Sequence, residues 1–205
     1  MSCAVKLPRL VLITDWTLPR GELERVLEAV LPLGPSLALQ HRHPGAEGRH
    51  FLEEAKWLQG LCRLHGNPLF INDRLDVARL LSTHLHLPAH SVDVAAARSH
   101  LPDGWVSAAV HNQAEAERAA GADFALVSPV FSPGSKPGDT RPSLGWEGFL
   151  RLARALPCPA FALGGLTPQN ILIPAAGIAV MGAVWRSARP RETASLLLGG
   201  QTPAA

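Results

Sequence analysis

Residues 105–128, WVSAAVHNQAEAERAAGADFALVS, contain a complete strand–helix–strand unit. Apolar residues run almost without a break through Trp105–Val110 and again through Phe124–Ser128. Such runs are typical of parallel strands that are buried on both faces. Gln113–Ala120, which lies between them, is a short amphipathic stretch of the kind that forms a crossover helix. The unit therefore predicts two parallel strands joined by a helix.

The same alternation extends over the rest of the chain. The other apolar runs that we interpret as strands are Leu10–Thr14, Ser36–His41, Pro68–Ile71, Thr83–Leu87, Ala160–Leu163 and Ile178–Met181. The clearer amphipathic stretches between them are Glu22–Leu31, Phe51–Leu64 and Gly148–Leu156. Weaker helical segments follow residues 73, 91 and 167. This alternation predicts an α/β fold, a (β/α)8 TIM barrel, and a doubly wound open sheet is the alternative.

The length and composition are those of one soluble globular domain. Of the 205 residues, 47% are hydrophobic and 18% are charged. We expect a single domain over residues 1–205, with its core at about 9–190 and a frayed C-terminal tail. Cys3, Cys62 and Cys158 are too far apart to suggest a disulfide framework or a zinc site.

The charge and hydropathy patterns exclude some classes of partner. A formal net charge of +2, without a basic cluster, gives no indication of nucleic acid as a partner. The sequence shows neither a signal peptide nor an apolar stretch long enough to cross a bilayer. We therefore expect a cytoplasmic protein that binds neither nucleic acid nor a membrane.

Three loops that follow predicted strands contain groups that suit a phosphate. They offer hydroxyls, one lysine, and glycines that let backbone N–H groups approach an anion closely. Phosphate sites recur after the seventh and eighth strands of such barrels, where two of these loops lie. The residues concerned are Ser132, Ser135, Lys136, Gly164, Gly165, Met181 and Gly182.

The second predicted strand ends in QHRHP at residues 40–44. Because side chains alternate along a strand, Gln40 and Arg42 share one face, and His41 and His43 share the other. Arg42 can hold a phosphate or a carboxylate through two parallel hydrogen bonds. A surface arginine that pairs with a helix is the alternative interpretation.

Carboxylates and histidines at other strand ends allow metal binding, each with an alternative. Asp73, which follows the third strand beside Asn72, either caps the next helix or ligates Mg²⁺. His84, His86 and His90 lie close together around the fourth strand, which suggests a metal site. Because no second carboxylate or cysteine completes that ligand set, histidines with ordinary hydrogen bonds are the favoured interpretation.

His111, at the end of the fifth predicted strand, is the best candidate for a general acid or base. The pKa of a histidine lies near neutrality, so its ring can both give and take a proton at working pH. A position between a strand and a helix places the ring at the mouth of the barrel. A histidine that caps or packs on the following helix is the alternative.

Taken in order, these pieces resemble the thiamine phosphate synthase and TenI family over about residues 9–190. The matching segments are LITD at 12–15, QHR at 40–42, INDRLDVA at 71–78, VHN at 110–112 with Glu115-Ala116, GADF at 121–124, SPVF at 128–131 with Ser135-Lys136, ALGG at 162–165 and GIAVM at 177–181. The resemblance implies a (β/α)8 barrel that acts on a phosphorylated thiazole in thiamin biosynthesis.

The family has two branches, and two departures bear on the choice between them. The synthase branch joins a pyrimidine pyrophosphate to thiazole phosphate with Mg²⁺, and it carries a lysine where this chain has Pro44. It also carries a metal-holding aspartate where this chain has Ser91, which leaves Asp73 alone unless Asp93 reaches in. The TenI branch has a His-Ser pair after strand four, like His90-Ser91, and needs no metal.

The resemblance therefore favours a TenI-like thiazole tautomerase, an isomerase that moves a proton on a carboxythiazole phosphate and needs no cofactor. His111 and His43 would be its catalytic groups. The substrate and its phosphate would be bound by Gln40, Arg42, Asn72, Ser132, Ser135, Lys136, Gly164, Gly165, Met181 and Gly182.

Two main alternatives stay open, beside a different phosphosugar-type barrel enzyme. One is a thiamine phosphate synthase that uses Mg²⁺ at Asp73, and the other is a non-catalytic regulatory relative that binds a phosphorylated ligand. In each case the expected partner is a small phosphorylated molecule, and a homo-oligomer remains open.

Overall fold

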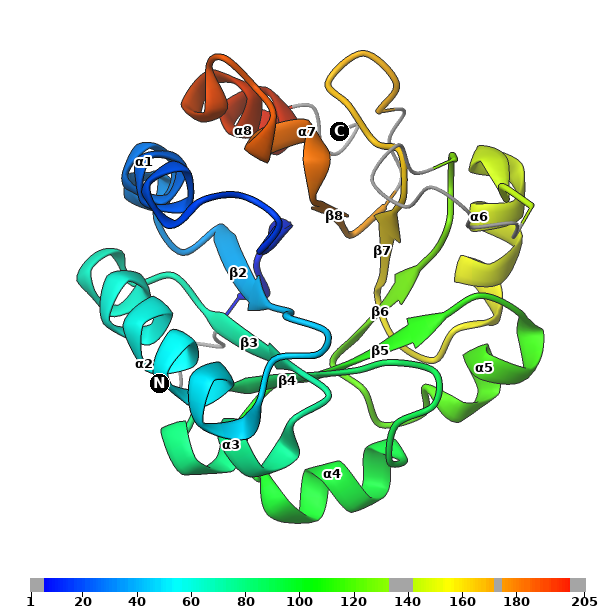
Figure 1. The fold of residues 1–205 in the computed structure, drawn as a ribbon. Coiled ribbons are helices and arrows are strands. Elements are labelled where there is room, and N and C mark those ends of the chain that lie inside the picture. Colours follow the sequence, from blue (N-terminus) through cyan, green and yellow to red (C-terminus); the bar gives the residue numbers. More distant parts are fainter. Residues whose placement is uncertain (1–5, 133–141, 172–174, 200–205) are drawn as a thin grey trace, which may run out of the picture.

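Eight parallel strands close into a barrel in the order β1 to β8, with β8 paired to β1 (Figure 1). The structure is a computed structural model and describes residues 6–132, 142–171 and 175–199. The (β/α)8 barrel expected from the sequence is confirmed, and the open-sheet alternative is wrong. The strands are β1 (Leu10–Ile13), β2 (Leu37–His41), β3 (Leu69–Asn72), β4 (His84–Leu87), β5 (Val106–Val110), β6 (Phe124–Val127), β7 (Ala160–Leu163) and β8 (Gly177–Val180).

Helices surround the barrel on its outer side (Figure 1). They are α1 (Arg20–Val30), the 3₁₀ helix η1 (Leu31–Leu33), α2 (Gly48–His65), α3 (Leu75–Leu81), α4 (Val94–His100), α5 (Gln113–Arg118), α6 (Gly145–Ala155), α7 (Gly182–Trp185) and α8 (Pro190–Gly199). The helix expected after residue 167 is replaced by a turn in the described residues 167–171. The Asn170 side chain holds this turn, since its Oδ1 accepts from Thr167 N and its Nδ2 donates to Gly165 O.

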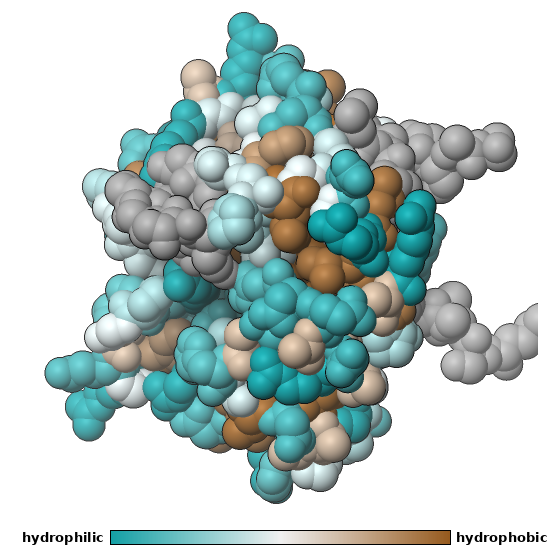
Figure 2. Space-filling view, turned by 90° about the vertical axis from the view of Figure 1, so that its right-hand side faces the viewer, coloured by the Kyte–Doolittle hydropathy of each residue, from teal (hydrophilic) through white to brown (hydrophobic). Residues whose placement is uncertain are grey.

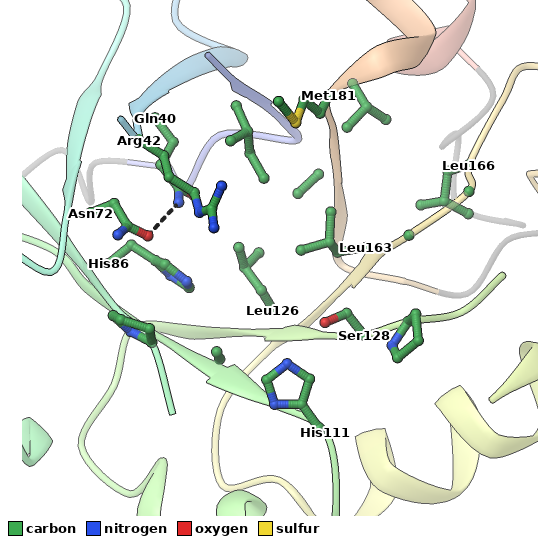
Figure 3. Close-up of a pocket in the computed structure, with 18 of the residues that line it drawn as sticks. Gln40, Arg42, Asn72, His86, His111, Leu126, Ser128, Leu163, Leu166 and Met181 are labelled. Carbon is green, nitrogen blue, oxygen red and sulfur yellow. Dashed lines mark hydrogen bonds between the residues drawn. The ribbon is translucent and has the colours of Figure 1, made fainter. Parts of the chain in front are cut away.

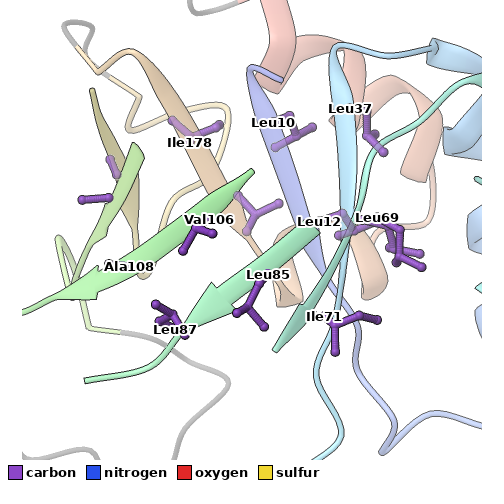
Figure 4. Close-up of a cluster of buried hydrophobic side chains, with 14 of the residues drawn as sticks. Leu10, Leu12, Leu37, Leu69, Ile71, Leu85, Leu87, Val106, Ala108 and Ile178 are labelled. Carbon is purple, nitrogen blue, oxygen red and sulfur yellow. The ribbon is translucent and has the colours of Figure 1, made fainter. Parts of the chain in front are cut away.

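Side chains alternate along each strand and build two separate cores. Residues such as Leu10 and Leu12 point outward and pack against the helices (Figure 4). The inward set fills the barrel and consists of Val11, Ile13, Ala38, Phe70, Phe124, Leu126, Phe161 and Ala179. Gly177 is required beside this inner core, because a Cβ atom there would lie 2.4 Å from Cε2 of Phe161.

The C-terminal segment differs from the expected frayed tail. Residues 190–199 form α8, in which Ala194 and Leu197 are buried. Arg191 ties this helix to α1, because its Nη1 donates to the carbonyl of Ala29 over 3.2 Å. The tail expectation is therefore wrong for Pro190–Gly199, since apolar side chains on one face of this segment close the barrel's outer layer. Residues 200–205 lie outside the described residues.

Exposed apolar side chains are scattered over the surface. Among the described residues, the large exposed hydrophobic side chains lie on separate elements or loops: Leu64, Leu80, Val92 and Leu196. On the side where α5 and α6 lie, hydrophilic residues surround several separate hydrophobic areas (Figure 2). None of the helices in the described part of the chain has both the length and the apolarity that crossing a bilayer requires.

Candidate active site

A cavity of about 750 Å³ opens at the carboxyl ends of the strands (Figure 3). Its size is typical of a site for small molecules. Arg42, Asn72 and His86 lie on one side of it, and Leu163 and Leu166 lie on the other (Figure 3). The polar and charged residues that line it are Gln40, Arg42, Asn72, His86, His90, His111, Asn112, Glu115, Ser128, Ser132, Thr167 and Arg186.

Gln40, Arg42 and Asn72 form the polar side of the cavity, as their strand positions predicted. The Gln40 Nε2 group donates to Asn72 Oδ1 over 3.2 Å, which links β2 to β3. The backbone of Arg42 is fixed by Thr14, whose Oγ1 accepts from Arg42 N over 2.9 Å. Burial lowers the pKa of the Arg42 guanidinium. Within the described residues, no carboxylate forms an ion pair with it, so its charge is available to a ligand.

His43 does not lie in this cavity, although we expected it to be a second acid–base group. Strand alternation turns it to the opposite side from Arg42, where its Nδ1 lies 2.9 Å from Glu54 Oε2. Its ring also stacks on Trp16, with centroids 5.1 Å apart and an interplanar angle of 7°. The structure therefore separates His43 from His111.

His111 lines the cavity and is held by Glu115. The Nδ1–H of His111 donates to Glu115 Oε2 over 2.7 Å, and its backbone N–H donates to the same oxygen over 2.8 Å. Asn112 caps α5, since its Oδ1 accepts from Glu115 N over 3.0 Å. Burial raises the pKa of Glu115, but hydrogen bonds from His111 and Asn112 outweigh it, so the pKa lies below its ordinary value. This arrangement leaves the Nε2 atom of His111 available to a ligand.

The two histidines of β4, His84 and His86, have separate hydrogen-bond partners. His86, which lines the cavity, lies with its Nδ1 2.9 Å from Ser107 Oγ. Burial lowers the pKa of His86 to about 3, with further lowering by Arg42 and His111, so its ring is neutral. The Nδ1 of His84 accepts from the backbone N–H of Trp105 over 3.0 Å. These contacts agree with ordinary hydrogen-bonded histidines.

Gly164 and Gly165 bring the loop after β7 against the loop after β6. Gly165 has a φ of +60°, and a Cβ atom there would lie 2.7 Å from the Cβ of Phe131. The carbonyl of Gly164 accepts from Phe131 N over 3.0 Å. Both glycines line the cavity, together with Ser132, Met181 and Gly182. Ser135 and Lys136 lie outside the described residues.

Asp73 follows β3 with a φ of +66°, and its residue is exposed. It does not cap α3, because the N-cap residue is Arg74 and no side-chain hydrogen bond caps that helix. Asp93 caps α4 instead, since its Oδ1 accepts from Ala96 N over 2.6 Å. Of these two aspartates, Asp93 is therefore engaged in capping α4, whereas the carboxylate of Asp73 caps no helix.

Sequence reasoning missed Arg186, which reaches the cavity from the end of α7. Its Nη2 lies 3.8 Å from Oδ2 of the buried Asp15, which follows β1. One feature of the sequence could have identified Arg186: it lies four residues after Gly182, which is one helical turn beyond the end of a predicted strand. Ser128 and Thr167 also line the cavity beyond the expected set.

Comparison with known proteins by sequence places the chain in one family. The family described as thiamine monophosphate synthase (TMP-TENI) matches residues 10–184. The chain is 37% identical over 198 residues to a thiamine-phosphate synthase from Azorhizobium caulinodans, covering 92% of each chain. It is 35% identical to one from Chloroflexus aurantiacus, covering 86% of this chain and 84% of that one.

A solved structure agrees with these relatives. Thiamine phosphate pyrophosphorylase from Pyrococcus furiosus superimposes with a TM-score of 0.79 at 30% identity, covering 94% of both chains. These names overturn the expectation of a TenI-like tautomerase and of isomerase activity, because the similar curated proteins are named as synthases. The differences at Pro44 and Ser91 are two positions in a similarity that extends over 86–92% of the chain.

Proposed function

Because the chain belongs to the thiamine monophosphate synthase family, we propose that it is a transferase that forms thiamine phosphate. Its substrates would be hydroxymethylpyrimidine pyrophosphate and thiazole phosphate. The names of the relatives from Azorhizobium caulinodans and Chloroflexus aurantiacus support this choice.

The cavity has two chemically different sides, and this difference is the main support for the proposal. Gln40, Arg42 and Asn72 provide a guanidinium and amides on one side (Figure 3). Gly164 and Gly165 provide backbone at close range on the other side. A condensation of two phosphorylated substrates needs two anion-binding regions, and the two sides of the cavity offer them.

In the proposed reaction, the bond between the pyrimidine methylene carbon and the pyrophosphate oxygen breaks, and pyrophosphate leaves with the electron pair. The thiazole nitrogen uses its lone pair to form the new carbon–nitrogen bond. Negative charge therefore grows on the leaving oxygen, and fixed cations near it lower the barrier. Arg42 is suited to this role because it is half-buried and its backbone is held by Thr14.

Arg186 is a second cation that faces the cavity and would offset the lysine missing at Pro44. The Nη2 atom of Arg186 lies 3.8 Å from Asp15 Oδ2, which is longer than a hydrogen-bonded ion pair, so the guanidinium keeps its donors for a ligand. Since His86 is kept neutral by burial, it adds hydrogen bonding and no charge.

For Mg²⁺ the residues present offer one exposed carboxylate, Asp73, which follows the cavity-lining Asn72 and is not itself among the residues that line the cavity. Mg²⁺ usually keeps several waters and binds one or two carboxylates together with substrate phosphate oxygens. Asp73, exposed at the end of β3 and not used as a cap, would hold it, with the pyrophosphate supplying further oxygens. When bound, the ion would supply charge neutralisation to the leaving group.

His111 would hydrogen-bond a substrate through Nε2. Because Glu115 binds its Nδ1–H, the ring has one orientation and one free nitrogen. His111 would therefore bind a substrate and could give or take a proton beside the reacting atoms. It would not be the base of an isomerase, which was the role expected from the sequence.

The proposal is tested by incubating the purified protein with both substrates and Mg²⁺ and separating the products by chromatography. We expect thiamine phosphate only when both substrates and the metal are present. A folded protein that binds both substrates and forms no thiamine phosphate would contradict the proposal.

A further inference from the structure

His43, His50 and Glu54 form a cluster outside the cavity, between the loop after β2 and the start of α2. The Nδ1 of His43 and the Nε2 of His50 each lie 2.9 Å from an oxygen of Glu54. One ligand atom from each of the three residues lies within 4.8 Å of the others. His50 and Glu54 are four residues apart and so share one face of α2.

We infer that these three residues bind a divalent cation of the zinc class. Two imidazoles and one carboxylate are a zinc ligand set that leaves a fourth, tetrahedral position open to water. Bonds of about 2.0–2.2 Å place tetrahedral ligand atoms roughly 3.3–3.6 Å apart, so each imidazole nitrogen needs to move only slightly away from the Glu54 oxygen that now lies 2.9 Å from it. The side chain of His50 is 62% exposed and can make that adjustment.

The charge of Glu54 is the main argument for a cation. Its side chain is 4% exposed, and a buried carboxylate is costly unless a cation or several hydrogen bonds compensate it. In the described part of the chain its ion-pair partners are His41, His43 and His50, which are charged only when protonated. A metal ion would supply the positive charge without protonating any of them.

The neighbouring aromatic residues support the ligand geometry. Trp16 stacks on His43 at 5.1 Å and fixes the plane of its ring. His41 is not a ligand, because its Nδ1 accepts from Trp16 Nε1 and its Nε2 donates to the carbonyl of Phe51.

The bound cation would fasten the loop after β2 to α2. His43 lies in this loop directly after Arg42, which faces the cavity from the other side of the chain. The site lies outside the cavity, and it is distinct from Asp73 and from the proposed Mg²⁺. Zinc binding is measured without substrates, so its failure and the failure of the proposed synthase activity are separate results.

The test uses the untagged, chelator-treated full chain and titrates it with Zn²⁺ by calorimetry and with Co²⁺ by visible absorption. We expect one zinc per chain and a rise in melting temperature. His43→Ala and His50→Ala should each weaken zinc binding by about tenfold or more. His65→Ala, which removes an exposed histidine from the same helix, and Asp73→Asn should leave zinc binding unchanged.

His50→Ala keeps the test valid if other variants fail to fold, because this side chain is the most exposed of the three. Absence of zinc binding at 0.1 mM, or unchanged affinity in folded His50→Ala, would overturn the inference. A cobalt–thiolate charge-transfer band would also overturn it, because that band would assign the ion to cysteine. Equal loss of zinc binding in Asp73→Asn would place the ion at the active site instead.

Discussion

The Nδ1 atom of His111 lies 2.7 Å from a carboxylate oxygen of Glu115, one helical turn further along the chain. The same oxygen accepts the backbone N–H of His111, so one carboxylate fixes both the ring and the start of α5. This pair makes His111 an oriented group at the wall of the cavity.

Glu115→Gln should lower kcat/KM for thiamine phosphate formation by about tenfold, because a charge-assisted hydrogen bond to His111 becomes a neutral one. Glu117→Gln is the matched control, since Glu117 is exposed on the same helix. Steady-state kinetics of the two variants check this prediction. Equal kinetics in both would remove Glu115 from the positioning of His111.

Stability should fall in mild acid because of buried neutral histidines. Burial lowers the pKa of His86 to about 3 from an ordinary value of 6.5, so the unfolded state binds the proton first. Its stabilising contribution is complete above pH 6.5 and is lost as the pH falls toward the folded-state pKa. His41 and His84, with pKa values lowered to about 4, act in the same direction.

Urea unfolding of the wild type and of His86→Gln at pH 7 and pH 5 measures this effect. The wild type should lose up to about 2 kcal/mol more than His86→Gln between these pH values, from 1.36 kcal/mol per pKa unit. If the variant kept the wild-type pH dependence, His86 would not be the group that titrates.

Arg42→Ala should reduce kcat/KM by about 10²–10³-fold, the range seen when one fixed donor to developing negative charge is removed. The guanidinium is half-buried and has no carboxylate partner among the described residues. Removing it therefore breaks no ion pair within that part of the protein and removes a contact to the ligand. Arg63→Ala, an exposed position on α2, is the control for charge alone. A similar loss in both variants would argue against a direct role for Arg42.

Most of the fold could be predicted from the sequence because burial on both faces leaves continuous apolar runs. The run Phe124–Ser128 marks β6 to within one residue of its observed end at Val127. The last helix was missed because Pro190 and the glycines that follow it suggested a free end. Its packing against α1 depends on tertiary contacts such as Arg191 with Ala29, which no local pattern reveals.

The candidate site was predictable where strand alternation decides it and not where distant elements meet. Alternation predicted that Gln40 and Arg42 share one face of β2, and both line the cavity. His43 belonged to the opposite face by the same rule, so its choice as a catalytic group conflicted with that pattern. Arg186 was missed because it meets the cavity through the closure of β8 onto β1, a contact between the two ends of the barrel.

Gly165→Ala should destabilise the protein by roughly 1–3 kcal/mol, because the added methyl group overlaps Phe131 in a left-handed backbone conformation. It should also raise the KM for thiazole phosphate, since the loop after β7 would shift. Gly60→Ala, with open space around it in α2, should instead stabilise by about 0.5–1 kcal/mol. Chemical unfolding of both variants checks the prediction. An unchanged free energy of unfolding in Gly165→Ala would contradict the close contact with Phe131.

The most direct test of the proposed condensation measures pyrophosphate and thiamine phosphate together in one reaction. We expect the two products in equal amounts at every time point, and a higher Mg²⁺ requirement in Asp73→Asn, because this exposed carboxylate would hold the ion. Pyrophosphate without an equal amount of thiamine phosphate, or no release of pyrophosphate at all, would contradict the account.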